Sequence, residues 1–123
     1  MLLDLVVTEP AVGVVAIAII GELDMSTAPR LREAIIAAAT GDRPRIVLDL
    51  SGVDLLDPTG LGVVFDGVKR TRSRGGDLVL CGVGPRARQD LDLLRVSEIL
   101  PIHESVAAAA LSLSAAPPTA GRS

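Results

Sequence analysis

The side chains best placed for chemistry lie in the segment "LLDPTGLGVVF", which runs from Leu55 to Phe65. Asp57 and Thr59 come just before apolar residues that recur at helical spacing, which predicts that a helix begins near Pro58. The Asp57 carboxylate would accept from free N–H groups of the first turn, and proline is tolerated there because its missing N–H would have no partner. Helix capping alone therefore explains Asp57 and Pro58.

The hydroxyl of Thr59 allows a second interpretation of the same segment. A hydroxyl in the first turn of a helix lies beside unpaired N–H groups and the positive end of the helix dipole, where an added phosphate would be stabilised. An ordinary first-turn threonine instead forms a local hydrogen bond. Spacing alone does not separate a phosphate acceptor from a capping segment.

Few other residues have the types and spacing that catalysis needs. His103 is the single histidine, and Cys81 stands alone in the apolar run "LVLCGV". Neither has a partner at a spacing typical of nucleophilic or metal chemistry. The segment "CGVGPRA" lacks the full glycine spacing of a nucleotide-binding loop and is interpreted as a turn. The sequence therefore predicts a protein that is not an enzyme and that uses no metal or cofactor.

Composition limits the class of protein and its partners. A chain of 123 residues with 49% hydrophobic and 22% charged residues is typical of one globular domain. The net charge of −3 gives no basic surface, which argues against nucleic acid as a partner. The lone cysteine favours a cytoplasmic location, and the longest apolar run, "AVGVVAIAII", is shorter than the ~18 residues of a spanning helix. Membrane insertion is not expected.

Apolar segments separated by turn residues predict the elements that position these side chains. "LDLVVTE" and "GVVAIAIIG" are expected to form a hairpin, and "DMSTAPRLREAIIAAAT" a helix with Ser26 or Thr27 as its N-cap. The apolar residues of this helix at helical spacing are Leu31, Ile35, Ile36 and Ala39. "RIVLDLS" is nearly continuously apolar, which predicts a central strand covered on both faces.

The second half of the chain continues the alternation of helices and strands. The helix that begins near Pro58 is expected to stop at Gly75 and Gly76, and a fourth strand, "DLVLCGV", to follow. "PRARQDLDLLR" predicts a helix, "EILPI" a short fifth strand and "ESVAAAALSL" a closing helix. The order ββαβαβαβα indicates an α/β fold with a mixed, mostly parallel sheet and about four helices. Residues 1–113 form the predicted domain, and 114–123 a disordered tail.

Several of these segments together resemble the STAS domain, the family of bacterial anti-sigma factor antagonists. They are "GELDMSTAPRLREAI", "IVLDLSGVDLLDPTGLGVV" and "GGDLVLCGVG", in the order and at the separations that the family shows. The resemblance extends to about Leu113. It implies a sheet of four or five strands, with helices packed mainly on one side.

The resemblance also implies a function. Soluble members of the family bind an anti-sigma factor that is an ATP-dependent serine kinase, and they thereby release the sigma factor that it holds. The kinase phosphorylates the first hydroxyl of a "DSSG" or "DSTG" segment, which turns the antagonist off. A metal-dependent serine phosphatase removes the phosphate.

This chain departs from the family at the acceptor itself. Its segment reads "DPTG", so the position of the acceptor hydroxyl is Pro58, which has no side-chain oxygen. Asp57, Thr59 and Gly60 match the family segment, and Asp24 matches an acidic residue that lies near the acceptor on the partner-facing surface. The residues expected to bind the partner are Asp24, Ser26, Asp57, Pro58, Thr59, Gly60 and Leu61.

Three interpretations of this departure stay open. The protein could be a permanently unphosphorylated antagonist controlled by its abundance, it could use Thr59 as a displaced acceptor, or it could have left sigma regulation. In the last case, a STAS-like subunit of a lipid-transport ATPase or a signalling scaffold is the alternative function. We favour the first interpretation, because Pro58 also stiffens the start of the helix.

Overall fold

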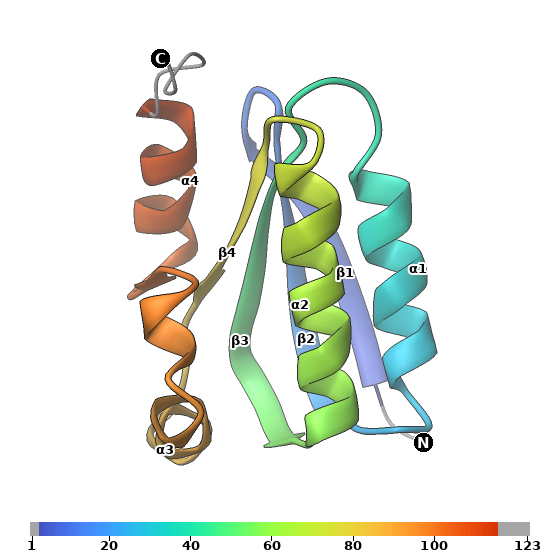
Figure 1. Ribbon diagram of the computed structural model, residues 1–123, viewed down its shortest axis with the longest axis vertical. Helices are drawn as coiled ribbons and strands as arrows, with labels where there is room; N and C mark the ends of the chain where they lie inside the picture. Colours follow the sequence, from blue (N-terminus) through green and yellow to red (C-terminus); the bar gives the residue numbers. More distant parts are fainter. Residues whose placement is uncertain (1–2, 116–123) are drawn as a thin grey trace.

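The computed structural model describes residues 3–115, in which a mixed sheet forms the central layer (Figure 1). Its five strands lie in the order β1-β2-β3-β4-β5. β1 (Leu3–Ala11) pairs antiparallel with β2 (Val14–Leu23), as the predicted hairpin requires. The parallel strands β3 (Arg45–Leu56), β4 (Asp77–Cys81) and β5 (Ile102–His103) complete the sheet. The predicted element order and the central position of the third strand are confirmed.

Helices cover both faces of this sheet. α1 (Ala28–Ala38) and α2 (Pro58–Arg72) pack side by side on one face, whereas α4 (Val106–Ala115) covers part of the other (Figure 1). α3 (Pro85–Leu93) and a short 3-10 helix (Val96–Glu98) connect β4 to β5. Between residues 3 and 115, no helix is both long and apolar enough to cross a membrane.

Two hydrophobic clusters explain the continuous apolar run of β3. Ile46, Leu48 and Leu50 point toward α1 and α2 in the larger cluster. Val47 points the other way and meets Ala109 of α4 in the smaller cluster. Because successive side chains of a strand alternate between faces, a strand covered on both sides needs apolar residues at nearly every position.

Three sequence predictions need correction. The fifth strand is only Ile102–His103 rather than "EILPI", because Arg95 adopts a left-handed conformation (φ 56°) and the chain then winds into the 3-10 helix. α4 continues through Ser114, the first residue of the predicted disordered tail; residues 116–123 of that tail lie outside the described part of the chain. Ile36 is 41% exposed, since the inward stripe of α1 follows every fourth residue through Leu31 and Ile35.

Cys81 is completely buried beneath α4, as its apolar surroundings predicted. Burial, and secondarily the carboxylate of Asp49 on the neighbouring strand, raises the pKa of the Cys81 thiol to about 11. The folded state therefore favours the neutral thiol. This preference stabilises the fold fully at pH values below the ordinary thiol pKa of 9.0, and the stabilisation is lost as the pH rises from 9.0 toward 11.

We expect Cys81 to be inert in the native protein. A thiol reagent at pH 8 should label it about 100-fold more slowly than it labels the chain unfolded in guanidinium, because the thiolate is the reactive form and α4 blocks access. The rate is measured by the absorbance of the released chromophore. Native labelling as fast as that of the unfolded chain would contradict the structural role of Cys81.

Candidate functional site

The candidate site is built where β2 and β3 end side by side. Leu23, the last residue of β2, is in register with Leu56, the last residue of β3. The next backbone N–H, that of Asp57, donates to the carbonyl oxygen of Leu23 at 3.1 Å. This bond places the turn that contains Asp24 beside the first turn of α2.

Asp57 caps α2, as the sequence predicted. Its backbone is extended (φ −101°, ψ 173°), its Oδ1 accepts from the N–H of Gly60 at 2.9 Å, and its carbonyl accepts from Leu61 at 3.0 Å. Pro58 occupies the first helical position without loss, because it has no N–H to satisfy. The start of α2 is therefore rigidly held.

Gly60 allows this close approach of α2 to β2. A Cβ atom on Gly60 would lie 2.6 Å from Cγ of Leu23 and 2.9 Å from the Leu23 carbonyl oxygen. Gly60 is buried, so its role in the site is to let the helix start reach the end of the strand.

The turn before α1 is organised by the carboxylate of Asp24. Its Oδ1 accepts from the backbone N–H groups of Ser26 (2.9 Å) and Thr27 (3.1 Å) and from the Ser26 hydroxyl (2.7 Å). Thr27 is the N-cap position, but its hydroxyl donates to the carbonyl of Glu22 at 2.7 Å and does not cap the helix. Thr27 therefore occupies the predicted N-cap position without a capping side-chain bond, and the Asp24 carboxylate instead holds the N–H groups of the two residues that precede α1.

These hydrogen bonds keep Asp24 ionised. The Ser26 hydroxyl lowers the pKa of the Asp24 carboxyl below its ordinary value of 3.8. Desolvation is the next largest effect and opposes it, and the N–H groups of Thr27 and Ser26 then lower the pKa further. Within residues 3–115, the hydrogen bonds to this carboxylate all end on Oδ1. Its other oxygen is therefore open to a partner.

The residues expected to bind the partner differ in their exposure to solvent. Ser26, Pro58 and Thr59 are exposed, and Asp24 and Asp57 are half-buried. Gly60 and Leu61 are buried and contribute to packing. In the described residues the Thr59 hydroxyl makes no hydrogen bond, so the local bond expected of an ordinary first-turn threonine is absent there.

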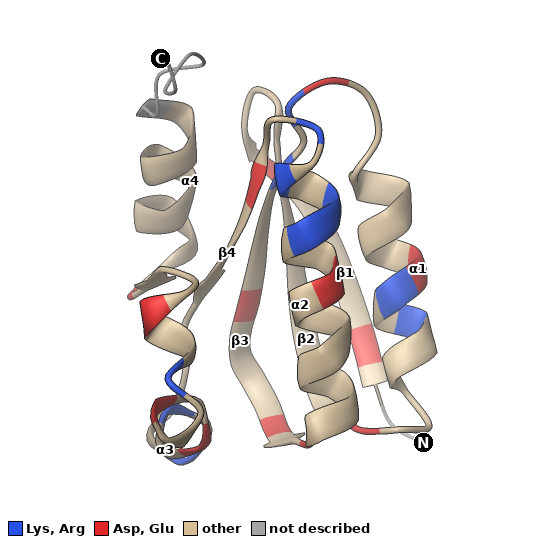
Figure 2. Ribbon diagram, viewed as in Figure 1, with Lys and Arg blue, Asp and Glu red and all other residues tan. Residues whose placement is uncertain are grey.

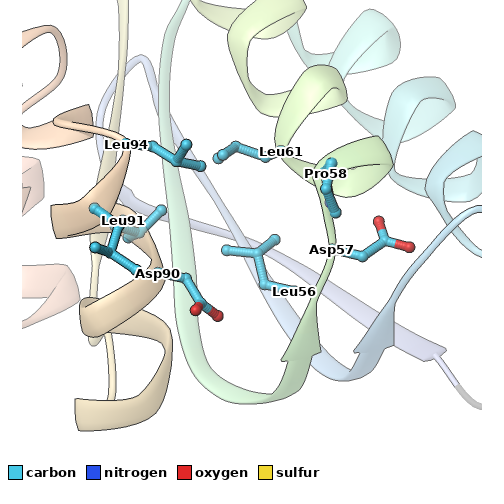
Figure 3. Close-up of a pocket in the computed structure, with 8 residues that line it drawn as sticks. Leu56, Asp57, Pro58, Leu61, Asp90, Leu91 and Leu94 are labelled. Atoms are coloured by element: carbon cyan, nitrogen blue, oxygen red, sulfur yellow. The ribbon is translucent and has the colours of Figure 1, made fainter.

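Sequence reasoning missed a groove beside the helix start, between α2 and α3 (Figure 3). It has a volume of about 390 Å³ and a predominantly apolar lining. We call it the leucine groove, and its lining residues are Leu56, Asp57, Pro58, Leu61, Asp90, Leu91, Leu93 and Leu94. The signal in the sequence is the run "LDLLR", whose leucines cannot all face the core of a short helix.

Charge is separated along α2 (Figure 2). The only charged residue at its start is the capping Asp57, whereas its last turn carries Lys69, Arg70 and Arg72. The surface around the site therefore combines carboxylates with apolar side chains. Among residues 3–115, no group of three or more His, Cys, Asp or Glu side chains could hold a metal ion.

The fold and this site define the class of the protein. The STAS domain family model matches residues 6–109, and the chain belongs to this family. It is 31% identical to the anti-sigma F factor antagonist of Paenibacillus polymyxa over 94 residues, which are 76% of this chain and 80% of the relative. It is 34% identical to an anti-sigma-B factor antagonist of Listeria monocytogenes over 82 residues, 67% of this chain and 72% of the relative.

A solved structure confirms the predicted fold. The crystal structure of an anti-sigma factor antagonist from Mycobacterium paratuberculosis superimposes with a TM-score of 0.81 at 26% identity. The match covers 92% of this chain and 95% of that chain. The resemblance to the STAS domain is therefore confirmed by both sequence and structure.

Removal of the α2 cap should lower stability measurably. We expect Asp57→Ala to reduce the free energy of unfolding by about 1 kcal/mol, because the N–H of buried Gly60 would lose its partner. Asp57→Ser, which keeps a capping oxygen, should restore most of the loss. Urea unfolding followed by circular dichroism measures both variants, and equal stability of Asp57→Ala and wild type would contradict the capping role.

Proposed function

We propose that this protein is an anti-sigma factor antagonist that binds a serine-kinase anti-sigma factor and so frees the sigma factor held by that kinase. It acts in the cytoplasm by binding rather than by catalysis. The names of the relatives support the anti-sigma factor as the partner. The kinase type of that partner follows from the resemblance to the soluble STAS proteins.

The observation that carries this proposal is the position of Asp24 next to the start of α2. The bond from Asp57 to Leu23 holds the two acidic positions together, and Pro58 and Thr59 lie exposed beside them. A rigid, acidic and accessible helix start is the surface that such a partner would recognise.

Pro58 removes the usual means of turning this surface off. It stands on the surface where the acceptor hydroxyl would be, and it has no oxygen to receive a phosphoryl group. A serine phosphatase would find no phosphate to remove at this position. The activity of the protein would then follow its concentration.

Thr59 is the remaining hydroxyl of the segment. It is exposed, but one residue along a helix rotates the side chain by about 100° from the direction of residue 58. The fixed φ of Pro58 and the Asp57 cap oppose unwinding of the helix start toward a kinase. We therefore assign Thr59 to the binding surface rather than to the switch.

Binding to purified partners tests the proposal. The kinase-type anti-sigma factors of the host are produced one at a time, and isothermal titration measures their affinity for the full chain. We expect one of them to bind and to release its sigma factor. Asp24→Asn, which keeps an acceptor oxygen but removes the charge, should weaken binding by about tenfold.

Asp42→Asn is the matched control, because Asp42 is exposed in the loop between α1 and β3, at the other end of α1. It should bind like wild type. If none of the anti-sigma factors binds, or if Asp24→Asn and wild type bind equally, the proposed function or its site is wrong. Binding to a transporter ATPase or a scaffold instead would support the alternative function.

A further inference from the structure

We infer that the leucine groove receives an apolar side chain of the anti-sigma factor, from a segment that carries a lysine or arginine next to that side chain. This inference rests on the proposed function, because it names a second contact of the same partner. The groove adjoins the helix start and shares Asp57 and Pro58 with it. A partner that covers the helix start would therefore also cover the groove.

The leucines of the groove are arranged for contact with another molecule. Leu56, Leu61 and Leu94 point toward one another from β3, α2 and the end of α3 (Figure 3). Leu93 is 82% exposed and Leu94 is 57% exposed. Contiguous exposed apolar residues of this kind are typical of interaction surfaces, since leaving them in water costs free energy.

Folding of this domain does not account for these exposed leucines. α3 is anchored by Leu91, its single buried residue among Pro85–Leu93. The 3-10 helix that follows is anchored separately by Val96. Leu93 and Leu94 add little to the core, so their apolar surface is available to a partner.

The charge of the leucine groove indicates which kind of partner segment would bind there. The leucine groove contains two carboxylates, Asp57 and Asp90, and no cation. A neighbouring hollow shares Leu56 and Asp90 and adds Asp54 together with Arg86. Among the residues that line the groove and this hollow, carboxylates outnumber cations, so a basic residue flanking the inserted side chain would be attracted.

Pro58 itself favours this mode of binding. Its ring lines the groove, so the residue that replaces the usual acceptor adds apolar surface where a serine would add a hydroxyl. The exposed Leu93 and Leu94 leave one side of the groove open to solvent, where a side chain presented by a protein surface can enter.

The test compares two exposed leucines with the purified anti-sigma factor that the wild-type chain binds. We expect Leu94→Glu to weaken binding by about tenfold or more, because it places a charge in the groove. Leu111→Glu is the matched control, since Leu111 is 69% exposed on α4, on the other face of the sheet. It should bind within about twofold of wild type.

Two further variants separate apolar contact from charge and from misfolding. Leu93→Glu changes a residue that is 82% exposed, so it should fold normally and still weaken binding. Asp90→Asn should weaken binding by less than Leu94→Glu and should reduce the dependence of the affinity on salt. Circular dichroism and thermal unfolding verify that each variant is folded.

Each outcome decides between the two proposals. If wild type binds the anti-sigma factor and folded Leu94→Glu and Leu93→Glu bind equally well, the groove inference is wrong and the proposed function stands. If wild type binds none of the host's anti-sigma factors, both are wrong. Native mass spectrometry that finds an apolar small molecule bound to wild type and absent from Leu94→Glu would make the groove a ligand pocket and would also overturn the inference.

Discussion

Pro58→Ser is expected to turn this protein into a substrate of the kinase-type anti-sigma factor that we propose as its partner. The substitution adds a hydroxyl and a backbone N–H at the first position of α2 without disturbing the Asp57 cap, which bonds to Gly60. The new hydroxyl would lie at an exposed position beside the positive end of the helix dipole, where a phosphate is stabilised. The kinase would transfer the terminal phosphoryl group of ATP to this oxygen.

Phosphorylation of the variant should then abolish tight binding. A phosphate adds about −1.5 to −2 charges next to Asp24 and Asp57, at a surface that is already acidic. We expect the affinity of phosphorylated Pro58→Ser for the anti-sigma factor to fall about 100-fold below that of its unphosphorylated form, which is about 2.7 kcal/mol. Mass spectrometry locates the phosphate, and titration calorimetry gives the affinity.

Pro58→Ala is the control, because it removes the ring without adding a hydroxyl. It should remain unphosphorylated at residue 58 and should bind the anti-sigma factor whether or not ATP has been present. A Pro58→Ser protein that binds the kinase but is never phosphorylated would show that the position no longer reaches the active site. Phosphorylation without loss of affinity would show that residue 58 lies outside the binding surface.

Among glycine-to-alanine substitutions at the glycines whose surroundings the structure describes, Gly76→Ala should destabilise the protein most. A Cβ atom at this position would lie 1.8 Å from the carbonyl oxygen of Pro44, which is backbone that cannot rotate away. The same carbonyl accepts from the N–H of Asp77 at 3.0 Å and starts the pairing of β3 with β4. We expect a loss of about 3 to 5 kcal/mol in the free energy of unfolding.

Gly62→Ala provides the matched comparison. Gly62 lies inside α2, and a Cβ there would meet nothing within 4 Å. Alanine is the better helix former, so this variant should gain about 0.5 to 1 kcal/mol. Chemical unfolding measures both proteins. A Gly76→Ala protein as stable as wild type would contradict the close contact between the α2–β4 turn and Pro44.

The sequence predicted those features that depend on local pattern. The alternation of apolar segments and turns was sufficient for the element order, and an aspartate before a proline was sufficient for the cap of α2. The continuous apolar run from Ile46 indicated a strand with both faces covered, which the two clusters confirm. The family segments indicated the STAS fold as a whole.

Features that depend on tertiary contacts could not be predicted from local sequence pattern. Ser26 and Thr27 have the propensity of N-cap residues, but the way the chain turns from β2 into α1 directs the Thr27 hydroxyl to the carbonyl of Glu22, so it makes no cap bond. The leucine groove requires α3 to lie beside the start of α2, which no local pattern specifies. Leu93 and Leu94 look like core residues until the direction of α3 is known.

The most direct test of the central claim uses the unmodified protein. The wild-type chain is incubated with ATP and the purified kinase-type anti-sigma factor that it binds, and intact-mass spectrometry and size-exclusion chromatography follow the phosphate and the complex over time. We predict that no phosphate is added and that the complex persists, because Pro58 has no acceptor oxygen and the side chain of Thr59 is rotated by about 100° from the direction of residue 58. A phosphate on Thr59, accompanied by dissociation of the complex, would contradict this account.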